Sequence, residues 1–425
     1  SYLGTELHEM AHKPLRAKLS NPCGCTYTPP PILWNCACAH YESDKRINMQ
    51  VTCLRENLSR GLANVSRAVA SRATLPVTQN VLLEGDNGQL KLTATNTEIS
   101  ISTWIGAQIE GEGRITVPAR MLTDFVNSLP GQTVKIDFQN DPVGVIVTCD
   151  KFNGTINGIS AEEFPPIPTV EGGSSVTIPA DTFRGALERV VFAAATDDSR
   201  PVLTGVKVEL ADDSFTLAAA DGFRLAVETG KLGASVETEV GVIVPAKTLS
   251  EVERLLGDGS SSVELSIDAN GRSAKFRLDT SEIVTALVQG TFPDYEKLIP
   301  TSYGTKATVD LSSMVQATRA ASIFARDGSG IIRVIVSPGE GDGAGAVKVI
   351  SRAEEVGSNE NELDAKVEGE ETKVAFNSKF LMDVLNVLNG DDVDLETTTP
   401  SSPGVFRSEK HPGYTHVVMP MFIQW

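Results

Sequence analysis

The segment ITVPARMLTDFVNSLPG (residues 115–131) occurs in two further versions later in the chain. These are VIVPAKTLSEVERLLGD (242–258) and VAFNSKFLMDVLNVLNG (374–390). Each version predicts a short strand, a turn and an amphipathic helix, with Pro118, Pro245 or Asn377 at the turn. The turns are 127 and then 132 residues apart. This period has the size of a domain rather than of a solenoid repeat, so the sequence predicts three similar domains in tandem.

A second helical segment repeats with nearly the same period, beginning near residues 56, 181 and 312. Its apolar residues fall at helical spacing, as in Leu58, Leu62 and Val65. Alternating runs such as VKIDF, VKVEL and VELSI predict strands between the helices. This pattern predicts α+β domains, each an antiparallel sheet with two helices on one face. The polar stretch 354–372 of the third copy is instead expected to form a solvated hairpin loop.

Proline-rich segments near 165–168 and 293–300 mark the expected domain boundaries. We predict domains over residues 49–166, 167–297 and 298–425. The length of 425 residues agrees, since domains commonly have about 100–200 residues.

Residues 1–48 do not match the repeat, and we expect a disordered leader with Met49 as the working start of the protein. An HExxH pattern at His8–His12 resembles a zinc protease motif, but Pro14 follows it at once and would end the helix. The leader's four thiols offer a second zinc hypothesis, although their paired spacing is shorter than usual; they are Cys23, Cys25, Cys36 and Cys38. The prediction is no metal site, no cofactor and no catalytic residue. Only two cysteines follow, which disfavours a disulfide framework and fits a reducing cytoplasm.

Composition excludes a membrane protein, because no run of about 18 apolar residues occurs in the chain. The formal net charge of −18 argues against a nucleic-acid partner only if the positive charges are scattered. They are not scattered, because basic residues recur on the polar faces of both helices in every copy. A basic surface on an acidic protein suits a polyanion that is contacted without regard to sequence. The residues predicted to face it are Arg55, Arg60, Arg67, Arg72, Arg120, Arg184, Arg189, Arg200, Lys247, Arg254, Arg319 and Lys379, with Arg326 on the same helix as Arg319.

From Met49 almost to its end, the chain resembles the bacterial DNA sliding clamp family, the beta subunit of DNA polymerase III. Seven ordered motifs carry the resemblance: TLPVTQNVLLE, ITVPAR, SRPVLTGV, AADGFRLA, VIVPAK, GTFPDYEKLIP and HVVMPM, beginning at residues 74, 115, 199, 219, 242, 290 and 416. The resemblance implies a DNA clamp fold in which a head-to-tail homodimer closes a ring around duplex DNA. It implies a non-catalytic processivity factor, cytoplasmic and nucleoid-associated. Expected partners are the replicative polymerase, a clamp loader and other proteins that carry a clamp-binding motif.

The resemblance also implies a pocket between domains two and three for a short peptide with a Gln and a Leu/Phe pair. Its residues would be Leu203, Gly222, Phe223, Arg224, Leu225, Pro293, Lys297, Leu298, Val417, Val418, Met419, Pro420 and Met421. The chain departs from the family pattern at Phe223, where the family usually has His, and in its ending Phe422–Trp425. The peptide preference is therefore open. The dimer interface would include Phe152 and Ile156 from one subunit and Ile323 and Phe324 from the other.

Two alternative functions remain at this stage. One is a clamp-like scaffold that binds partner peptides without encircling DNA. The other is a zinc-binding or metalloprotease activity of the leader.

Overall fold

The computed structural model describes residues 48–70, 75–236, 238–257, 259–326, 329–339, 344–353, 355 and 357–424. The leader's cysteines and HExxH pattern lie outside the described residues, as do Arg72 and Trp425. The expectations placed on them are therefore not taken further.

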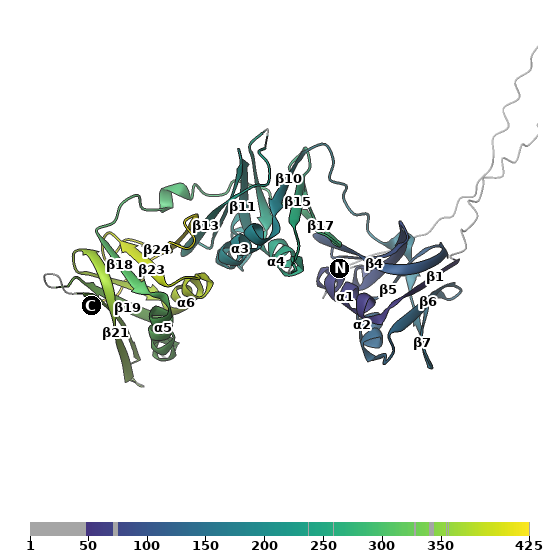
Figure 1. The fold of residues 1–425 in the computed structure, drawn as a ribbon, viewed down its shortest axis with the longest axis horizontal. Helices are drawn as coiled ribbons and strands as arrows, with labels where there is room; N and C mark the ends of the chain where they lie inside the picture. Colours follow the sequence, from purple (N-terminus) through teal and green to yellow (C-terminus); the bar gives the residue numbers. More distant parts are fainter. Residues whose placement is uncertain are drawn as a thin grey trace, which may run out of the picture. The chain divides into compact units, whose positions relative to one another are not determined.

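Three successive segments of the chain contain the same order of elements: strand, helix, four strands, helix, three strands (Figure 1). The first consists of β1 (Asn48–Leu54), α1 (Arg55–Val65), β2 (Asn80–Asp86), β3 (Gln89–Thr95), β4 (Ile99–Glu112), β5 (Arg114–Pro118), α2 (Ala119–Ser128), β6 (Thr133–Asn140), β7 (Val143–Cys149) and β8 (Phe152–Asn157), followed by the short β9 (Ile159–Ser160). The second consists of β10 (Ser174–Pro179), α3 (Ala180–Val190), β11 (Gly205–Ala211), β12 (Ser214–Ala220), β13 (Arg224–Lys231), β14 (Val240–Pro245), α4 (Ala246–Leu255), β15 (Ser262–Ile267), β16 (Ser273–Arg277) and β17 (Ser281–Ala286). The third consists of β18 (Thr305–Asp310), α5 (Leu311–Arg326), β19 (Ile331–Ser337), β20 (Gly345–Ala353), β21 (Gly357–Gly369), β22 (Thr372–Asn377), α6 (Ser378–Val387), β23 (Asp392–Thr397), β24 (Gly404–Arg407) and β25 (Tyr414–Val418).

These three segments are called domains 1, 2 and 3 below. Short 3₁₀ turns lie between their larger elements. Among them, η4 (Val191–Ala193) follows α3, and η6 (Glu296–Leu298) lies in the segment that joins domains 2 and 3.

The helices begin and pack as the sequence pattern predicts. Pro118 and Pro245 directly precede α2 and α4, while the Asn377 side chain caps α6 by accepting the Lys379 N–H at 2.9 Å. Leu58, Leu62 and other predicted apolar positions are buried. Each domain's two helices contact each other, and the first of them packs on strands of its own sheet: α1 on β3 and β4, α3 on β12 and β13, α5 on β20 and β21.

All strand pairs of the described residues are antiparallel. The expectation of a loop over 354–372 is wrong, because β21 is a strand of 13 residues. Residues 357–365 of β21 pair with β20, and residues 365–369 pair with β18. Backbone pairing with two neighbours thus makes a strand of a polar sequence that carries few strand-forming side chains.

The domains are joined by strand pairing that follows one rule. β17, the last strand of domain 2, pairs with β4, the fourth sheet strand of domain 1. In the same way β25, the last strand of domain 3, pairs with β13, the fourth of domain 2. The first of these joints is lined by hydroxyls, with Thr103 Oγ1 2.9 Å from Ser281 Oγ in a buried position. Each sheet therefore continues across a domain boundary.

No helix among the described residues has both the length and the apolar character needed to cross a membrane. The two cysteines of this part of the chain, Cys53 and Cys149, are free and buried, and burial raises the pKa of the Cys53 thiol to about 11. A thiol of this kind is unreactive at neutral pH.

Candidate functional site

A small hydrophobic cluster lies at the joint between domains 2 and 3, separate from the main core. It takes Leu203 and Leu225 from domain 2, Phe292 and Tyr295 from the connecting segment, and Val417 from domain 3. The hydroxyl of Tyr295 donates to Glu209 Oε2 at 2.5 Å, which fixes the connecting segment on β11. Three parts of the chain thus build one apolar floor.

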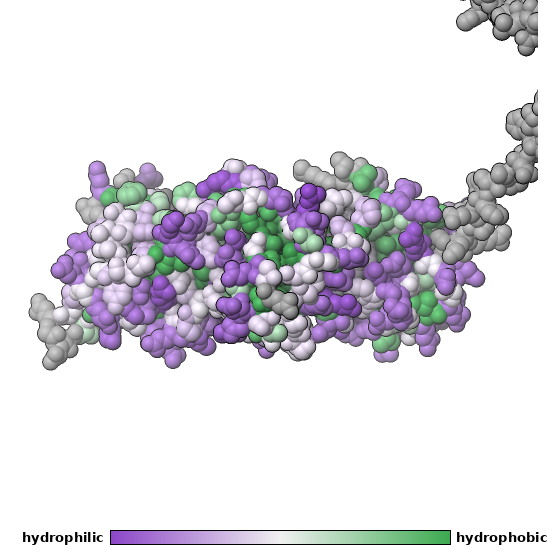
Figure 2. Space-filling model, turned by 90° about the horizontal axis from the view of Figure 1, so that it is seen from above, coloured by the Kyte–Doolittle hydropathy of each residue, from purple (hydrophilic) through white to green (hydrophobic). Residues whose placement is uncertain are grey.

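Large apolar side chains are exposed next to this floor. Phe223 is 60% exposed, Leu298 40%, Met421 37% and Phe422 86%. Most of the surface seen in Figure 2 is hydrophilic, with hydrophobic surface gathered in the middle of the face. An apolar surface above an apolar floor is typical of a site that binds another chain.

The turn before β13 holds Phe223 in a fixed position. Asp221 Oδ1 accepts the N–H groups of Phe223 at 2.8 Å and Arg224 at 3.0 Å, while the Phe223 carbonyl accepts the Met419 N–H at 2.8 Å. Gly222 has φ +93°, a conformation that favours glycine. The exposed ring is therefore anchored through its backbone on both sides.

Arg200 belongs to this turn rather than to a helix face. Its Nη2 donates to the Asp221 carbonyl at 2.7 Å, and a Cβ added at Gly222 would lie 2.6 Å from Arg200 Nη1. The prediction that Arg200 faces a polyanion from the helices is thus wrong, because its guanidinium covers the turn at the apolar site. Only the fold reveals this placement, since 21 residues separate the two partners.

The structure brings most of the predicted pocket residues to this one place. Leu203, Leu225 and Val417 lie in the floor, with Val418 buried beside them in the main core. Gly222, Pro293, Lys297 and Leu298 are exposed at the rim, and Met419 and Pro420 are half-buried. Lys297 is paired with Asp294 at 2.6 Å. Sequence reasoning missed three neighbours of Arg224: Phe192, Phe380 and Asp383.

Arg224 is the most constrained member of the site, with a side chain that is 7% exposed. Nε donates to Asp221 Oδ2 at 3.0 Å, Nη1 to Asp383 Oδ2 at 2.6 Å and Nη2 to the Phe192 carbonyl at 2.7 Å. The rings of Phe192 and Phe380 lie 5.1 and 4.8 Å from the guanidinium carbon. Charge-assisted hydrogen bonds and cation–π contacts of this kind are strongest in partly desolvated sites.

His416, in β25, is fully buried beneath the same site. The Tyr414 hydroxyl lies 3.0 Å from His416 Nδ1, the Phe192 ring stacks on the imidazole, and Nε2 has no hydrogen-bond partner among the described residues. Burial, and secondarily the Arg224 charge, lowers the pKa of His416 to about 3. The imidazole is therefore neutral in the folded protein at all ordinary pH values.

Most of the other predicted basic residues are exposed on the helices. The second residues of α2, α4 and α6, which are Arg120, Lys247 and Lys379, are exposed. So are Arg60, Arg67, Arg184, Arg254 and Arg319, whereas Arg55 is half-buried. Arg72 cannot be judged, because it lies outside the described residues.

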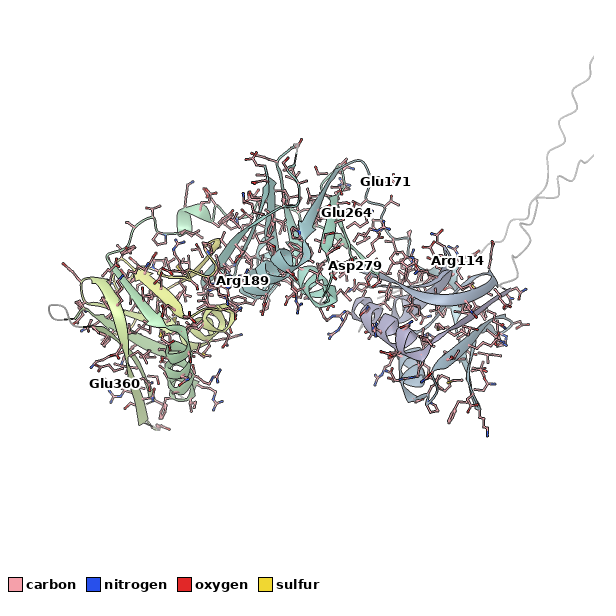
Figure 3. All side chains as sticks on the ribbon, viewed as in Figure 1. Arg114, Glu171, Arg189, Glu264, Asp279 and Glu360 are labelled. Carbon is pink, nitrogen blue, oxygen red and sulfur yellow. The ribbon has the colours of Figure 1, made fainter. Side chains whose placement is uncertain are left out.

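Arg189, labelled in Figure 3, lies on α3 and is only 9% exposed. Its Nε and Nη2 donate to the two carboxylate oxygens of Glu228 in β13, both at 2.9 Å, and both side chains are buried. The prediction that Arg189 faces a polyanion is therefore wrong, because a buried bidentate pair is too costly to break for an external anion.

Carboxylates interrupt the basic helix faces. Arg60 pairs with Glu56 at 3.0 Å, Arg120 with Asp124 at 3.7 Å and Arg254 with Glu251 at 2.8 Å. Burial, and secondarily the Glu188 charge, raises the pKa of Glu253 on α4. Exposed ion pairs contribute only about 0–1 kcal/mol, so an approaching phosphate can replace the carboxylate partner at little cost.

Of the four residues predicted for a dimer interface, Phe152 and Ile156 lie on β8, whereas Ile323 and Phe324 lie on α5. Phe152 in β8 is 50% exposed and Ile323 in α5 is 56% exposed. Phe324 is half-buried beside Gly357 at the start of β21. Ile156 is only 7% exposed and packs in the core of domain 1, so its side chain is not available to a partner as predicted.

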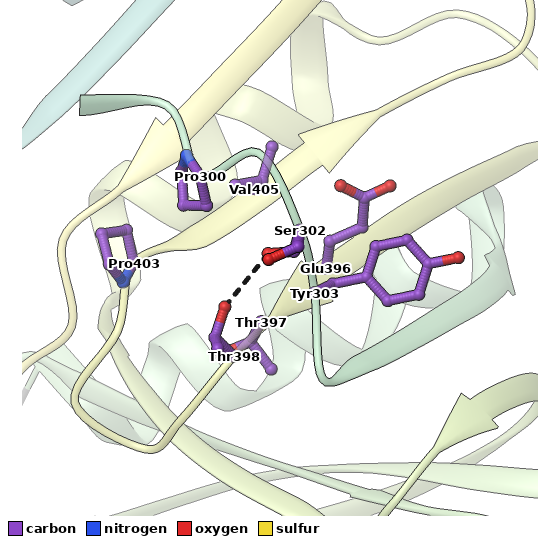
Figure 4. A pocket seen from close by; sticks show the side chains of 8 residues that line it. All are labelled: Pro300, Ser302, Tyr303, Glu396, Thr397, Thr398, Pro403 and Val405. Atoms are coloured by element: carbon purple, nitrogen blue, oxygen red, sulfur yellow. Dashed lines mark hydrogen bonds between the residues drawn. The ribbon is translucent and has the colours of Figure 1, made fainter. Parts of the chain in front are cut away.

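A shallow depression in domain 3 borders the apolar floor, because its lining includes Val405, a member of the same hydrophobic cluster (Figure 4). Pro300, Ser302, Tyr303 and Thr398 are among its lining residues, and the Thr398 hydroxyl donates to the Ser302 carbonyl at 3.2 Å across it. No group of three or more potential metal ligands occurs in the part of the chain that the structure describes.

Comparison with known proteins agrees with this arrangement. Residues 49–168 match the family model described as the DNA polymerase III beta subunit, N-terminal domain. Residues 177–294 match its central domain and residues 296–422 its C-terminal domain. The chain is 32% identical over 394 residues to a beta sliding clamp from Synechocystis, an alignment that covers 88% of this chain and 99% of that protein.

The chain belongs to the bacterial beta sliding clamp family. It is a non-catalytic DNA polymerase III accessory subunit that acts as a processivity clamp. The predicted family and clamp fold are thereby confirmed.

Solved clamp structures give the same result. The Bacillus subtilis clamp has a TM-score of 0.83 at 27% identity and covers 89% of this chain and 100% of that one. A clamp from Pseudomonas aeruginosa bound to griselimycin has a TM-score of 0.81 at 28% identity, with coverages of 88% and 100%. The fold similarity therefore extends over nearly all of the described residues.

We predict that His416 makes the clamp's stability depend on pH. Below about pH 6.5 the unfolded chain gains a proton on this residue, while the folded chain does not until about pH 3. The contribution of His416 to the free energy of unfolding is complete above pH 6.5. It is lost as the pH falls, by up to about 1.4 kcal/mol per pH unit. Urea unfolding between pH 7.5 and 4.5 should show a shallower pH dependence for His416→Asn than for the wild type. Equal slopes would show that His416 binds a proton in the folded state.

Proposed function

We propose that two copies of this chain join head to tail into a closed ring that holds duplex DNA. The observation that carries the proposal is the joining rule within the chain. Each joint pairs the last strand of one domain with the fourth strand of the domain before it. Among the described residues, β8, the last long strand of domain 1, and β21, the fourth strand of domain 3, have no such partner. Pairing them between two copies would repeat the same joint twice and close a ring of six domains.

Both strands offer the backbone groups that such a joint needs. Among the described residues, β8 pairs only with β7, and residues 357–364 of β21 pair only with β20. Exposed strand edges of this kind favour pairing with another chain. Phe152 and Ile323 supply exposed apolar surface next to the two edges. The acidic residues Glu360, Glu362 and Asp364 lie along β21, whereas Lys151 precedes β8, so the edges also differ in charge.

The basic helix residues then serve weak, sequence-independent contact with the DNA backbone. Arg120, Lys247 and Lys379 occupy equivalent helix positions in three domains, so the pattern would be repeated around the ring. The closed ring, rather than tight binding, keeps the protein on the DNA. Weak phosphate contacts leave the ring free to slide. Contacts to base edges would impede sliding.

The apolar site at the joint of domains 2 and 3 is proposed as the docking pocket for partner peptides. Its support is the exposed rim of Phe223, Leu298, Met421 and Phe422 over a separate apolar floor. Flexible methionine suits a pocket that accepts several peptides. The ligand class is a short peptide with a Gln and a Leu/Phe pair. Such a motif would recruit the replicative polymerase, a clamp loader and other partners in the cytoplasm, at the nucleoid.

Charging the proposed dimer edge should separate the subunits. Phe152→Asp buries a carboxylate at the joint, and the dimer dissociation constant measured by sedimentation equilibrium should rise about 100-fold. Met121→Asp is the matched control, because Met121 is 60% exposed in the same domain but lies on α2. A Phe152→Asp protein that dimerises as tightly as the wild type would rule out closure through β8.

Shortening a rim side chain should weaken peptide binding. In Met421→Ala the backbone N–H can still donate to the Ala375 carbonyl, so only the apolar contact is lost. The affinity for a fluorescent peptide that contains Gln and a Leu-Phe pair should fall about fivefold in a polarisation titration. Met121→Ala provides a control with the same chemical change outside the pocket. Equal affinity of Met421→Ala and the wild type would place the pocket elsewhere.

A further inference from the structure

Five side chains form a continuous stack through the joint of domains 2 and 3. The His416 ring stacks on Phe192 at 5.6 Å between centroids, with 10° between the planes. The Arg224 guanidinium lies between Phe192 and Phe380, at 5.1 and 4.8 Å. Phe380 in turn stacks on Phe223 at 6.2 Å and 21°.

The members of this stack come from both domains. His416 on β25 and Phe380 on α6 belong to domain 3, whereas Phe192, Arg224 and Phe223 belong to domain 2. From His416 to Phe223, the successive members of the stack therefore come from domains 3, 2, 2, 3 and 2. Separating the domains would require every contact between unlike members to break, and this interleaving makes the joint resist bending.

A polar brace fixes the centre of the stack. Asp383 on α6 of domain 3 accepts from Arg224 Nη1 at 2.6 Å, while Asp221 and the Phe192 carbonyl of domain 2 hold the other two nitrogens. With three nitrogens bonded and both faces covered, Arg224 offers little to an incoming peptide. Its structural position is that of a brace rather than of a ligand contact.

The two ends of the stack have different surroundings. At the outer end Phe223 is 60% exposed at the rim of the proposed peptide pocket. At the inner end His416 is completely buried, and its backbone pairs with Ala226 in the β13–β25 ladder that joins the two domains. The stack thus connects a ligand-binding surface with an interdomain strand pair.

We propose that the stack from Phe223 to His416 couples peptide occupancy to the rigidity of the domain 2–domain 3 joint, with Asp383 and Phe192 as positioning residues. The proposal rests on the peptide pocket of the proposed function. A peptide that packs on Phe223 restrains the outer ring and thereby the stack and the β13–β25 ladder. Because coupling is reciprocal, loosening the brace at Asp383 must weaken peptide binding even though the peptide does not contact Asp383.

The test combines peptide affinity with amide hydrogen exchange of the full chain. Asp383→Asn removes the charge at nearly constant shape, Asp383→Glu restores the charge, and Phe192→Leu removes one ring from the stack. Asp394→Asn is the matched control, because Asp394 also pairs with a cation in domain 3, Lys306 at 2.9 Å, away from the stack. The probe is a synthetic peptide with Gln and a Leu-Phe pair.

In the wild type, saturating peptide should slow amide exchange in β13 and β25. Asp383→Asn and Phe192→Leu should raise the peptide dissociation constant about tenfold and abolish this slowing. Asp383→Glu should recover at least part of the affinity, and Asp394→Asn should stay within about twofold of the wild type.

Wild-type protein that binds the peptide without any slowing of exchange in β13 and β25 would overturn the coupling while leaving the pocket intact. Folded Asp383→Asn and Phe192→Leu proteins with wild-type affinity would overturn it as well. Failure of the wild type to bind the peptide at all would instead overturn the proposed pocket, and the coupling with it.

Discussion

The pairing of the last strand of one domain with the fourth strand of the domain before it is the interaction on which the rest of this structure depends. It occurs twice within the chain, as β17 with β4 and as β25 with β13. It fixes the order of the domains, continues the sheets across their boundaries and brings together the parts of the chain that form the apolar site. Among the described residues it also leaves β8 and residues 357–364 of β21 paired on one side only. In the proposed ring these edges meet in a second copy of the chain.

The two joints differ in what surrounds the strand pair. Around β4 and β17 the contacts include a buried hydroxyl pair, Thr103 with Ser281, and the buried apolar pair Ile101 and Ile283. Around β13 and β25 there are a separate apolar cluster, a buried Arg189–Glu228 pair and the braced Arg224. Buried charges that make several hydrogen bonds add little net stability. Their main effect is to favour one packing arrangement of the joint over similar alternatives. The joint that carries the apolar site is therefore the more narrowly specified one.

Sequence periodicity was sufficient to predict the repeat, the helices and their buried faces, because these depend on residues three or four apart. It did not reveal that Arg184 is exposed and Arg189 buried, although both residues lie on α3. Arg189 falls close to the apolar face of Phe183 and Leu187, and its partner Glu228 interrupts the apolar part of β13, which was the one available signal. Arg200 and Asp383 gave no local signal, since their roles arise from partners 21 and 159 residues away. β21 was missed for a related reason, because its neighbours rather than its side chains make it a strand.

The central claim is that this clamp holds DNA by encircling it, with charge playing a minor part. The most direct measurement is retention of the protein on a nicked circular DNA after loading by a clamp loader, compared with the same DNA cut once to give free ends. Topological closure predicts that the protein stays on the circle and leaves the cut molecule at the same salt concentration. Equal retention on both forms would show that electrostatic binding holds the protein, and would contradict the claim.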